Sequence, residues 1–249
     1  MSVFKLKIIA CIAMVIDHIG AAVMLPVLEE AWMIPEVYMI FRGIGRIVFP
    51  IFAYLIAQGC YHTKNIGKYM LRLGMLAIIS EPFFDIAFWH QEEGISYLRD
   101  TNIFYTLFLG VVAIAIYGWM RDKLMLNSRF FRKSVYINIL SYCSAVPPII
   151  LAHFFTTDYS WRGVLLIFLI YIMDPNNQIN RCIAIAIGML LLYFNNIFSL
   201  SHSLVAVVLI ALYNGELEKN NVIIKWGFYF FYPLHIGALI VVRTLFLGI

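Results

Sequence analysis

Apolar runs of about 20 residues recur along almost the whole chain, and they constrain its fold more than any other feature. A helix of that length and character crosses the hydrocarbon core of a bilayer. Of the 249 residues, 63% are hydrophobic and 13% are charged, whereas about 45–50% of a soluble domain is apolar. Because the polar loops are short, the sequence predicts an all-α, polytopic integral membrane helix bundle in which residues 1–249 form a single domain.

We expect about nine transmembrane helices, at residues 6–26, 36–61, 67–89, 101–120, 135–154, 160–174, 180–195, 201–214 and 225–247. The sixth, seventh and eighth are shorter than the roughly 20 residues that a straight crossing needs. Two of them could therefore be re-entrant or interfacial, which would change the number of crossings and the side of the C-terminus.

The basic residues of the loops indicate the orientation, because Lys and Arg are enriched on the cytoplasmic side. With the N-terminus inside, the inner segments receive Lys5, Lys7, Lys64, Lys68, Arg72, Arg121, Lys123, Arg129, Arg132, Lys133, Arg181, Lys219 and Lys225. The outer segments receive Arg99, Arg162 and Arg243, with the acidic Glu29, Glu30, Glu92 and Glu93. The sequence therefore predicts a multi-pass protein of the cytoplasmic membrane with a cytoplasmic N-terminus, and it implies no nucleic-acid partner.

The first span carries Asp17 and His18 deep within its apolar run. A charged side chain there costs a few kcal/mol, so the pair suggests a functional site. Lys7 and His18 share a helix face, because eleven steps of about 100° make three turns plus roughly 20°. They lie about 16 Å apart along the axis, which suits a long cofactor held at Lys7 that reacts near His18. The alternative is a snorkelling lysine and a histidine satisfied by neighbouring helices.

Two further spans carry charged pairs at helical spacing. Arg42 and Arg46 share a face of the second span, and the glycines beside them permit close helix approach. In the third span Glu81 and Asp85 share a face. The two pairs, together with Asp17, could form a structural ion-pair network. The alternative is that the arginines bind an anionic group and the carboxylates serve acid–base chemistry.

The predicted orientation brings the unusual polar residues to the outer half of the bundle, where we expect them to line a shared cavity that opens outward. These residues are His18, Glu81, Asp85, Asn102, Asp158, Trp161, Arg162, His202 and His235. Asn102 could cap the fourth span or take part in catalysis. His235, in an aromatic span after a proline, has the character of a packing residue.

His18 is the best candidate for a general base, because a buried neutral imidazole can accept a proton near pH 7. Asp17 points about 100° away from it on a helix and is better placed to pair with Arg42 or Arg46. No spacing of histidines, carboxylates or cysteines matches a metal site, and the four cysteines occur singly.

Several of these stretches together resemble the TraX family. They are Lys7-Ile-Ile-Ala-Cys-Ile-Ala-Met-Val-Ile-Asp-His-Ile-Gly20, Phe41-Arg-Gly-Ile-Gly-Arg-Ile-Val-Phe-Pro-Ile-Phe-Ala-Tyr-Leu-Ile-Ala-Gln-Gly59, Ile79-Ser-Glu-Pro-Phe-Phe-Asp85, Asn102-Ile-Phe-Tyr-Thr-Leu-Phe-Leu-Gly110 and Asp158-Tyr-Ser-Trp-Arg-Gly-Val164. That family includes the conjugation-associated protein that N-acetylates the amino terminus of pilin. The chain is also similar, more distantly, to the transmembrane acyltransferases and the acyltransferase-three family. Their basic-x10-His signature reads here as Lys7 to His18, and Phe231-Tyr-Pro-Leu-His235 looks like a further landmark.

The resemblance implies an acetyltransferase that uses acetyl-CoA. His18 would be the catalytic base, and Lys7 and Arg72 would approach the phosphates of the cofactor. The implied catalytic group is His18, Asp17, Glu81, Asp85 and Asn102, and the implied cofactor-binding group is Lys7, Arg42, Arg46 and Arg72.

Two functional hypotheses follow. In the first, the protein moves an acetyl group from cytosolic acetyl-CoA to an amine of an exported peptide or small molecule at the outer side. In the second, it is a transporter or assembly component without chemistry, and the intramembrane charges form a gate or proton relay. The sequence contains no internal repeat of the kind that many transporters have, which favours the enzyme.

Overall fold

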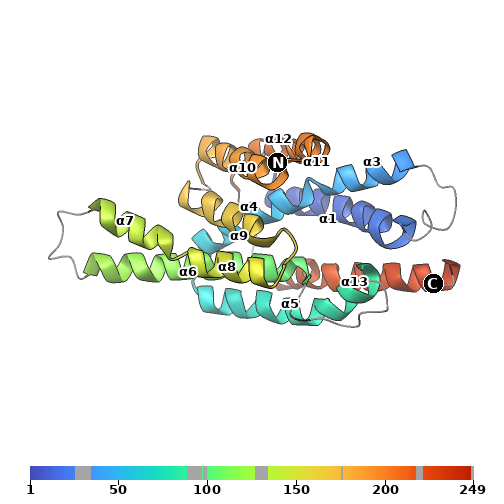
Figure 1. The fold of residues 1–249 in the computed structure, drawn as a ribbon, viewed down its shortest axis with the longest axis horizontal. Helices are drawn as coiled ribbons and strands as arrows, with labels where there is room; N and C mark the ends of the chain where they lie inside the picture. The colour runs from blue at the N-terminus through green and yellow to red at the C-terminus, as the bar shows by residue number, and fades with distance from the viewer. Residues whose placement is uncertain are drawn as a thin grey trace.

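The computed structural model describes residues 1–25, 35–88, 97, 100–126, 134–174, 176–216 and 221–247, and the described chain is helical (Figure 1). The elements are α1 (Val3–Ile19), the π-helical turn η1 (Gly20–Met24), α3 (Pro35–Gly45), α4 (Val48–His62), α5 (Ile66–Phe88), α6 (Ile103–Leu126), α7 (Ser134–Cys143), α8 (Val146–Phe154), α9 (Ser160–Ile172), α10 (Gln178–Tyr193), α11 (Ile197–Ser203), α12 (Val205–Ala211) and α13 (Val222–Leu247). The prediction of an all-α fold is confirmed for this part of the chain.

Within the described residues, each predicted helix coincides with one helix or with two consecutive helices, and prolines explain two of the breaks. Pro50 cannot donate a hydrogen bond to the carbonyl of Arg46, and the chain turns at residues 46–47 between α3 and α4. Pro147 and Pro148 have the same effect between α7 and α8, at residues 144–145. The sequence pattern therefore located the apolar segments, and the breaks divide some of them into shorter helices.

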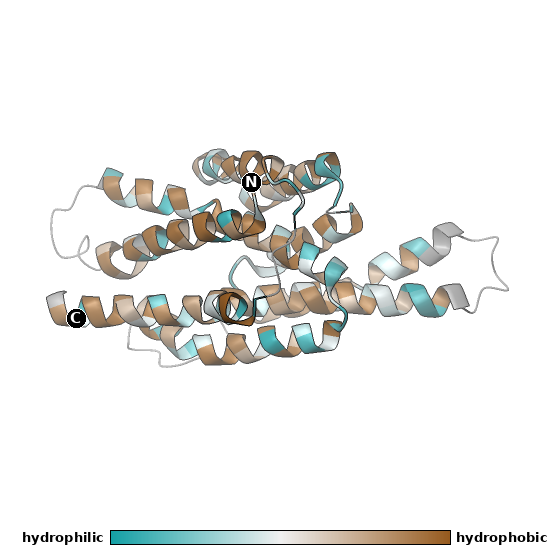
Figure 2. Cartoon of the chain, turned by 180° about the vertical axis from the view of Figure 1, so that it is seen from behind, coloured by the Kyte–Doolittle hydropathy of each residue, from teal (hydrophilic) through white to brown (hydrophobic). Residues whose placement is uncertain are grey.

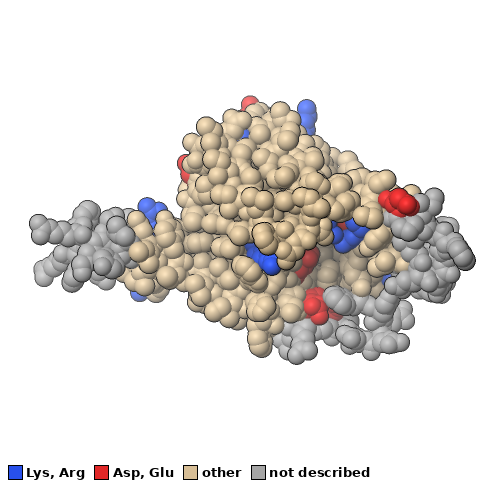
Figure 3. Space-filling view, turned by 45° about the horizontal axis from the view of Figure 1, so that its top comes forward, with Lys and Arg blue, Asp and Glu red and all other residues tan. Residues whose placement is uncertain are grey.

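Among the described residues, four helical segments are long and apolar enough to cross a membrane: Val3–Met24, Glu36–His62, Ile103–Leu124 and Val222–Leu245. The 23-residue α5 is not among them, and it carries Lys68, Arg72, Glu81 and Asp85. Most other apolar helices are shorter, at Asn138–Phe154, Ser160–Ile172, Gln178–Tyr193 and Ile197–Ala211. The helices are largely apolar (Figure 2), and ionised side chains are sparse on the face in Figure 3. These features indicate a membrane protein, while nine crossings and a cytoplasmic N-terminus stay predictions.

Hydrogen bonds tie the connections at each end of the bundle. At one end, the amino group of Met1 donates to the carbonyl of Leu212 over 2.7 Å. There the α4 terminus also meets the α9–α10 connection, since His62 Nε2 lies 3.2 Å from Asn176 Oδ1. At the opposite end, the guanidinium of Arg243 donates to the Ile86 and Ala87 carbonyls at the C-terminus of α5.

This arrangement groups the charged residues as the orientation prediction does. The end at which α1, α5 and α13 begin contains Lys5, Lys7, Lys64, Lys68, Arg72 and Lys225, and we call it the basic end. Arg162 and Arg243 belong to the opposite end. Arg99, Arg129, Arg132, Lys133, Lys219 and the acidic Glu29, Glu30, Glu92 and Glu93 lie outside the described residues.

Candidate active site

A cavity of about 740 Å³ connects the basic end of the bundle with His18. Its wall is formed by α1, α4, α5, α6, α13 and the connection between α8 and α9. It reaches the surface at the basic end, where Lys64, Lys68 and Asn221 line it and are exposed. The volume lies within the range of about 300–1,000 Å³ that is usual for ligand sites.

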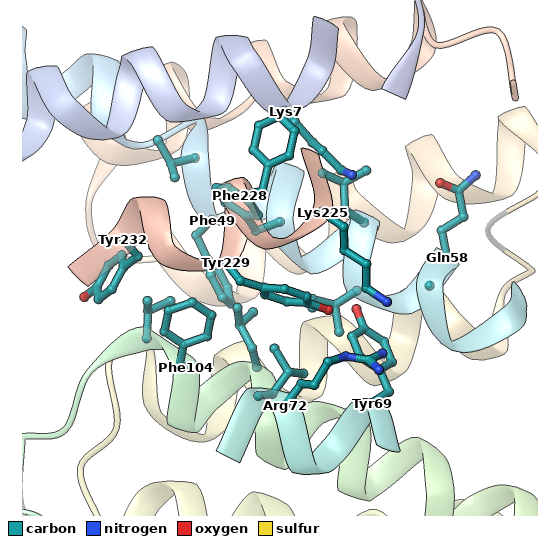
Figure 4. A pocket seen from close by; sticks show the side chains of 18 of the residues that line it. Lys7, Phe49, Gln58, Tyr69, Arg72, Phe104, Lys225, Phe228, Tyr229 and Tyr232 are labelled. Atoms are coloured by element: carbon teal, nitrogen blue, oxygen red, sulfur yellow. The ribbon is translucent and has the colours of Figure 1, made fainter. Parts of the chain in front are cut away.

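Five basic side chains line the cavity toward the basic end: Lys7, Lys64, Lys68, Arg72 and Lys225. Figure 4 shows the charged ends of Lys225 and Arg72 close together beside the Tyr69 and Tyr229 rings. Lys225 is close enough to Arg72 and Lys7 for their charges to interact. Asp17 and Asp158 are the carboxylates that the described residues contribute to the wall, and Asp17 lies ten residues from Lys7 on α1, about 15 Å along the helix axis. An anion at the basic end would offset the mutual repulsion of these cations.

Aromatic rings hold two of these cations in place. The Nζ of Lys7 lies 4.9 Å from the centroid of the Phe228 ring, and the guanidinium of Arg72 lies 5.6 Å from that of Tyr69. The Nε atom of Arg72 is buried without a hydrogen-bond partner among the described residues. Cation–π contacts stabilise these two charges at the cavity wall.

Between the basic end and His18 the wall is apolar and aromatic. It includes Phe49, Phe52, Phe104, Phe228 and Tyr232. The Phe49 and Tyr159 rings stack with centroids 3.9 Å apart, and Phe104 meets Tyr232 edge-on at 5.2 Å. Such a wall suits a slender ligand chain and keeps water away from the inner part of the cavity.

His18 pairs with His235 across the interface of α1 and α13. Its Nδ1 lies 2.7 Å from His235 Nε2, and the two rings are nearly parallel, with centroids 4.9 Å apart. The Nδ1 of His235 lies 2.7 Å from the carbonyl oxygen of Phe231. The rings of Phe88 and Tyr232 meet the His18 ring edge-on, with ring centroids 5.0 and 5.9 Å from that of His18. The partly buried imidazole of His18 is therefore held by a second imidazole at the cavity wall.

Asp17 forms an ion pair with Arg42, as the sequence predicted. Arg42 Nη1 donates to Asp17 Oδ1 over 2.6 Å, and the two side chains are 25% and 19% exposed. Their close approach depends on Gly45, because a Cβ atom there would overlap the Asp17 side chain. The glycines of the Arg42–Arg46 stretch thus have the packing role expected of them.

Replacing Gly45 with alanine is expected to lower the free energy of unfolding by roughly 1–3 kcal/mol, because the new methyl group displaces Asp17 from Arg42. Unfolding in detergent, followed by circular dichroism, measures this change. Gly118→Ala is the matched control. A Cβ atom there meets nothing within 4 Å, so we expect a gain of about 0.5–1 kcal/mol from the helical glycine. Equal stability of the two variants would contradict the packing role of Gly45.

Glu81, Asp85 and Asn102 lie outside the cavity wall that the described residues form. Asn102 caps α6, since its Oδ1 accepts from the Phe104 N–H over 2.9 Å, which confirms the capping interpretation. Its side-chain amide donates to Glu81 and to the Ala77 carbonyl. Glu81 and Asp85 are buried on α5. The group thus joins α5 to α6, and its predicted catalytic role gains no support from the cavity.

Arg42 and Arg46 lie near Asp17, away from Lys7 and Arg72. The Arg46 guanidinium lies 5.9 Å from the centroid of the Tyr193 ring, and neither arginine contributes to the described wall. The four residues that the sequence grouped as cofactor ligands therefore occupy two places. Lys7 and Arg72 line the basic end of the cavity, and Arg42 and Arg46 lie around the ion pair at its inner end.

The polar residues predicted to share an outward-opening cavity are also divided. Of this set, His18 and Asp158 line the cavity, which reaches the surface at the basic end. Asp158 belongs to the connection between α8 and α9, where burial raises the pKa of its carboxyl to about 6. Arg162 donates to the Leu192 carbonyl over 3.2 Å and does not line the cavity.

Sequence reasoning missed the pairing of His235 with His18. It placed Lys64, Lys68 and Lys225 on the same side of the bundle as Lys7 and Arg72 but did not name them among the site residues. One available signal was the alternation of helix direction, which brings the start of α13 to the same end as the start of α5. A second signal was the proline two residues before His235.

The fold and its apolar helices indicate a membrane protein of packed helices with an internal cavity. The chain belongs to the TraX family. The model of that family, described as "TraX protein", matches residues 2–243. It is 28% identical over 257 residues to the "Probable fimbrial assembly protein FimC, serogroup H1" of Dichelobacter nodosus. The match covers 96% of this chain and 94% of that relative. No solved structure matches the chain.

Proposed function

We propose that the protein is a membrane-embedded acetyltransferase. It takes acetyl-CoA at the basic end, which we assign to the cytosol, and transfers the acetyl group to an amine of an exported acceptor at the other side. The observation that carries the proposal is the single cavity that joins the cluster of cations to His18. The relative's description as a probable fimbrial assembly protein favours a pilin-like peptide as the acceptor.

The chemistry of the cavity wall fits acetyl-CoA at each end. Its phosphates carry several negative charges, which the Lys and Arg side chains of the basic end would offset. The unpartnered Nε of Arg72 offers one further donor. The pantetheine arm is long and narrow, as the aromatic part of the cavity requires. Lys7 and His18 are eleven residues apart on α1, or about 16 Å along its axis, so bound phosphates and a reacting thioester can be separated by that arm.

In the proposed reaction, His18 acts as the general base. The acceptor amine attacks the thioester carbonyl carbon, a C–N bond forms, and His18 takes a proton from the attacking nitrogen. The tetrahedral intermediate then collapses as the C–S bond breaks, and His18 returns the proton to the departing thiolate of CoA. The products are the N-acetylated acceptor and free CoA. The apolar surroundings of His18 keep water from competing for the thioester.

The test uses purified protein in lipid nanodiscs with acetyl-CoA labelled in the acetyl group and a peptide with a free amino terminus. We expect label in the peptide in amide linkage, identified by tandem mass spectrometry, and none when the amino terminus is blocked. The competing function is transport without chemistry. Saturable CoA flux in proteoliposomes, with no acetylated product for any amine offered, would favour that alternative and reject the transferase.

A further inference from the structure

We propose that His235 is a positioning residue that fixes the tautomer of His18 and so sets which nitrogen acts as the base. This inference rests on the proposed function, because it assigns the proton acceptor of that reaction to one atom, His18 Nε2. It goes beyond the proposed function by giving a catalytic purpose to a histidine on α13, 217 residues away in the sequence.

The proton positions on His235 and His18 follow from the hydrogen-bond acceptor at the end of the series, the carbonyl oxygen of Phe231. The carbonyl oxygen of Phe231 can only accept a hydrogen bond. The Nδ1 atom of His235, 2.7 Å away, must therefore carry a hydrogen. In a neutral imidazole the other nitrogen then has a lone pair, so His235 Nε2 accepts from His18 Nδ1–H over 2.7 Å. This leaves the lone pair on Nε2 of His18, the residue that lines the cavity.

The nearby carboxylate does not take this role. Asp17 precedes His18 and so points about 100° away on the helix, and its carboxylate is held by Arg42 at 2.6 Å. An imidazole partner also keeps the resting pair uncharged between Phe88 and Tyr232, where a buried carboxylate without a cation would be costly. The structure thus uses a neutral acceptor where many enzymes use an aspartate.

The local helix geometry supports this use of His235. Pro233 lies within α13 and lacks an N–H, so the carbonyl of Tyr229 loses its usual helical donor and the turn is loosened. His235 stacks on Phe231, with ring centroids 4.9 Å apart, and it is 9% exposed. The ring is therefore fixed on one face by Phe231 and at its Nε2 edge by the hydrogen bond with His18.

During the reaction His235 keeps its proton. When His18 Nε2 takes the proton of the attacking amine, the imidazolium continues to donate through Nδ1–H to the lone pair of His235. When the thiolate leaves, the same Nε2 proton passes to sulfur. Without His235, the tautomer of His18 with hydrogen on Nε2 becomes accessible, and that form cannot accept the proton of the amine at this position.

The test compares three variants in nanodiscs: His235→Phe, His235→Gln and His235→Ala. For His235→Phe we expect kcat to fall by on the order of 10²-fold or more, with the KM for acetyl-CoA unchanged because the basic end is untouched. His235→Gln retains an oxygen that can accept from His18 and should keep more activity. Wild-type kcat in His235→Phe would overturn the proposal.

Chemical rescue separates positioning from filling of space. Added imidazole is expected to restore activity to His235→Ala, because it can accept from His18 and donate to the Phe231 carbonyl. Pyrrole is similar in size and has an N–H, but its nitrogen has no lone pair available to accept from His18, and it should restore little. Equal restoration by both would show that His235 only fills a void and would overturn the proposal. Binding of acetyl-CoA to each variant, measured by thermal shift, establishes that the variants are folded.

Nitrogen-15 NMR of histidine-labelled protein tests the tautomer of His18 independently of acetyl transfer. In the wild type we expect a protonated Nδ1 and an unprotonated Nε2 for His18, and a mixture of tautomers in His235→Phe. This pattern in a wild type that transfers no acetyl group would reject the proposed function and leave the pairing intact. The Nε2–H tautomer of His18 in the wild type would overturn the positioning role whatever the activity.

Discussion

The His18→Gln variant is expected to lose between about 10²- and 10⁴-fold in kcat, the usual contribution of a general base. Glutamine is similar in size, and its amide can still donate to His235 Nε2, so the contact between α1 and α13 is retained. It cannot take up a proton near pH 7. The KM for acetyl-CoA should stay near the wild-type value, because the phosphates bind near Lys7, about 16 Å away along α1.

Steady-state transfer of labelled acetyl groups gives kcat, and isothermal titration with CoA gives the affinity. His153→Gln is the matched control, since His153 is exposed on α8 and does not line the cavity. We expect this control to behave as the wild type. Transfer by His18→Gln at the rate of the His153→Gln control would remove His18 from the role of base.

Charge reversal at the basic end is expected to have the second largest effect. In Arg72→Glu the KM for acetyl-CoA should rise by at least about 10- to 100-fold, because a hydrogen bond to a charged group contributes roughly 1.5–3 kcal/mol. The introduced carboxylate adds repulsion toward the phosphates. The kcat at saturating donor should change little, since His18 and His235 are untouched.

The matched control for Arg72→Glu is Arg121→Glu. Arg121 lies near the end of α6, is exposed, contacts the Tyr117 hydroxyl at 3.5 Å and does not line the cavity. The difference between the two variants should shrink at 1 M salt, where the Debye length is about 3 Å. Equal donor affinity in Arg72→Glu and Arg121→Glu would mean that the phosphates do not bind at the basic end.

Local periodicity was enough to predict several parts of the site. The positions of the apolar helices, the shared face of Lys7 and His18, and the pairing of Asp17 with Arg42 follow from helical geometry and from the cost of buried charge. The glycines of the Arg42–Arg46 stretch were also assigned correctly to close packing. The membership in the TraX family, inferred from the same stretches, is confirmed by the match over residues 2–243.

The remaining parts depend on contacts between helices that no local pattern encodes. His235 meets His18 only because α13 packs against α1, and from sequence alone it had the character of a packing residue. Glu81 and Asn102 looked reactive because buried polar groups are rare in apolar helices, but they bond to each other where α5 meets α6. The same polarity can serve a helix cap or a reaction, and tertiary packing decides between them.

The unequal distribution of charge along the cavity has a consequence for the permeability of the membrane. Cations gather at one end, whereas the inner end holds Asp17 with Arg42 and the carboxylate of Asp158. A polyanionic nucleotide is therefore attracted to its side of entry, and the balanced charges further in offer it no comparable attraction. Under the proposed function, only the acetyl group crosses the membrane. Free CoA leaves on the side from which acetyl-CoA entered, so the CoA pool of that compartment is conserved.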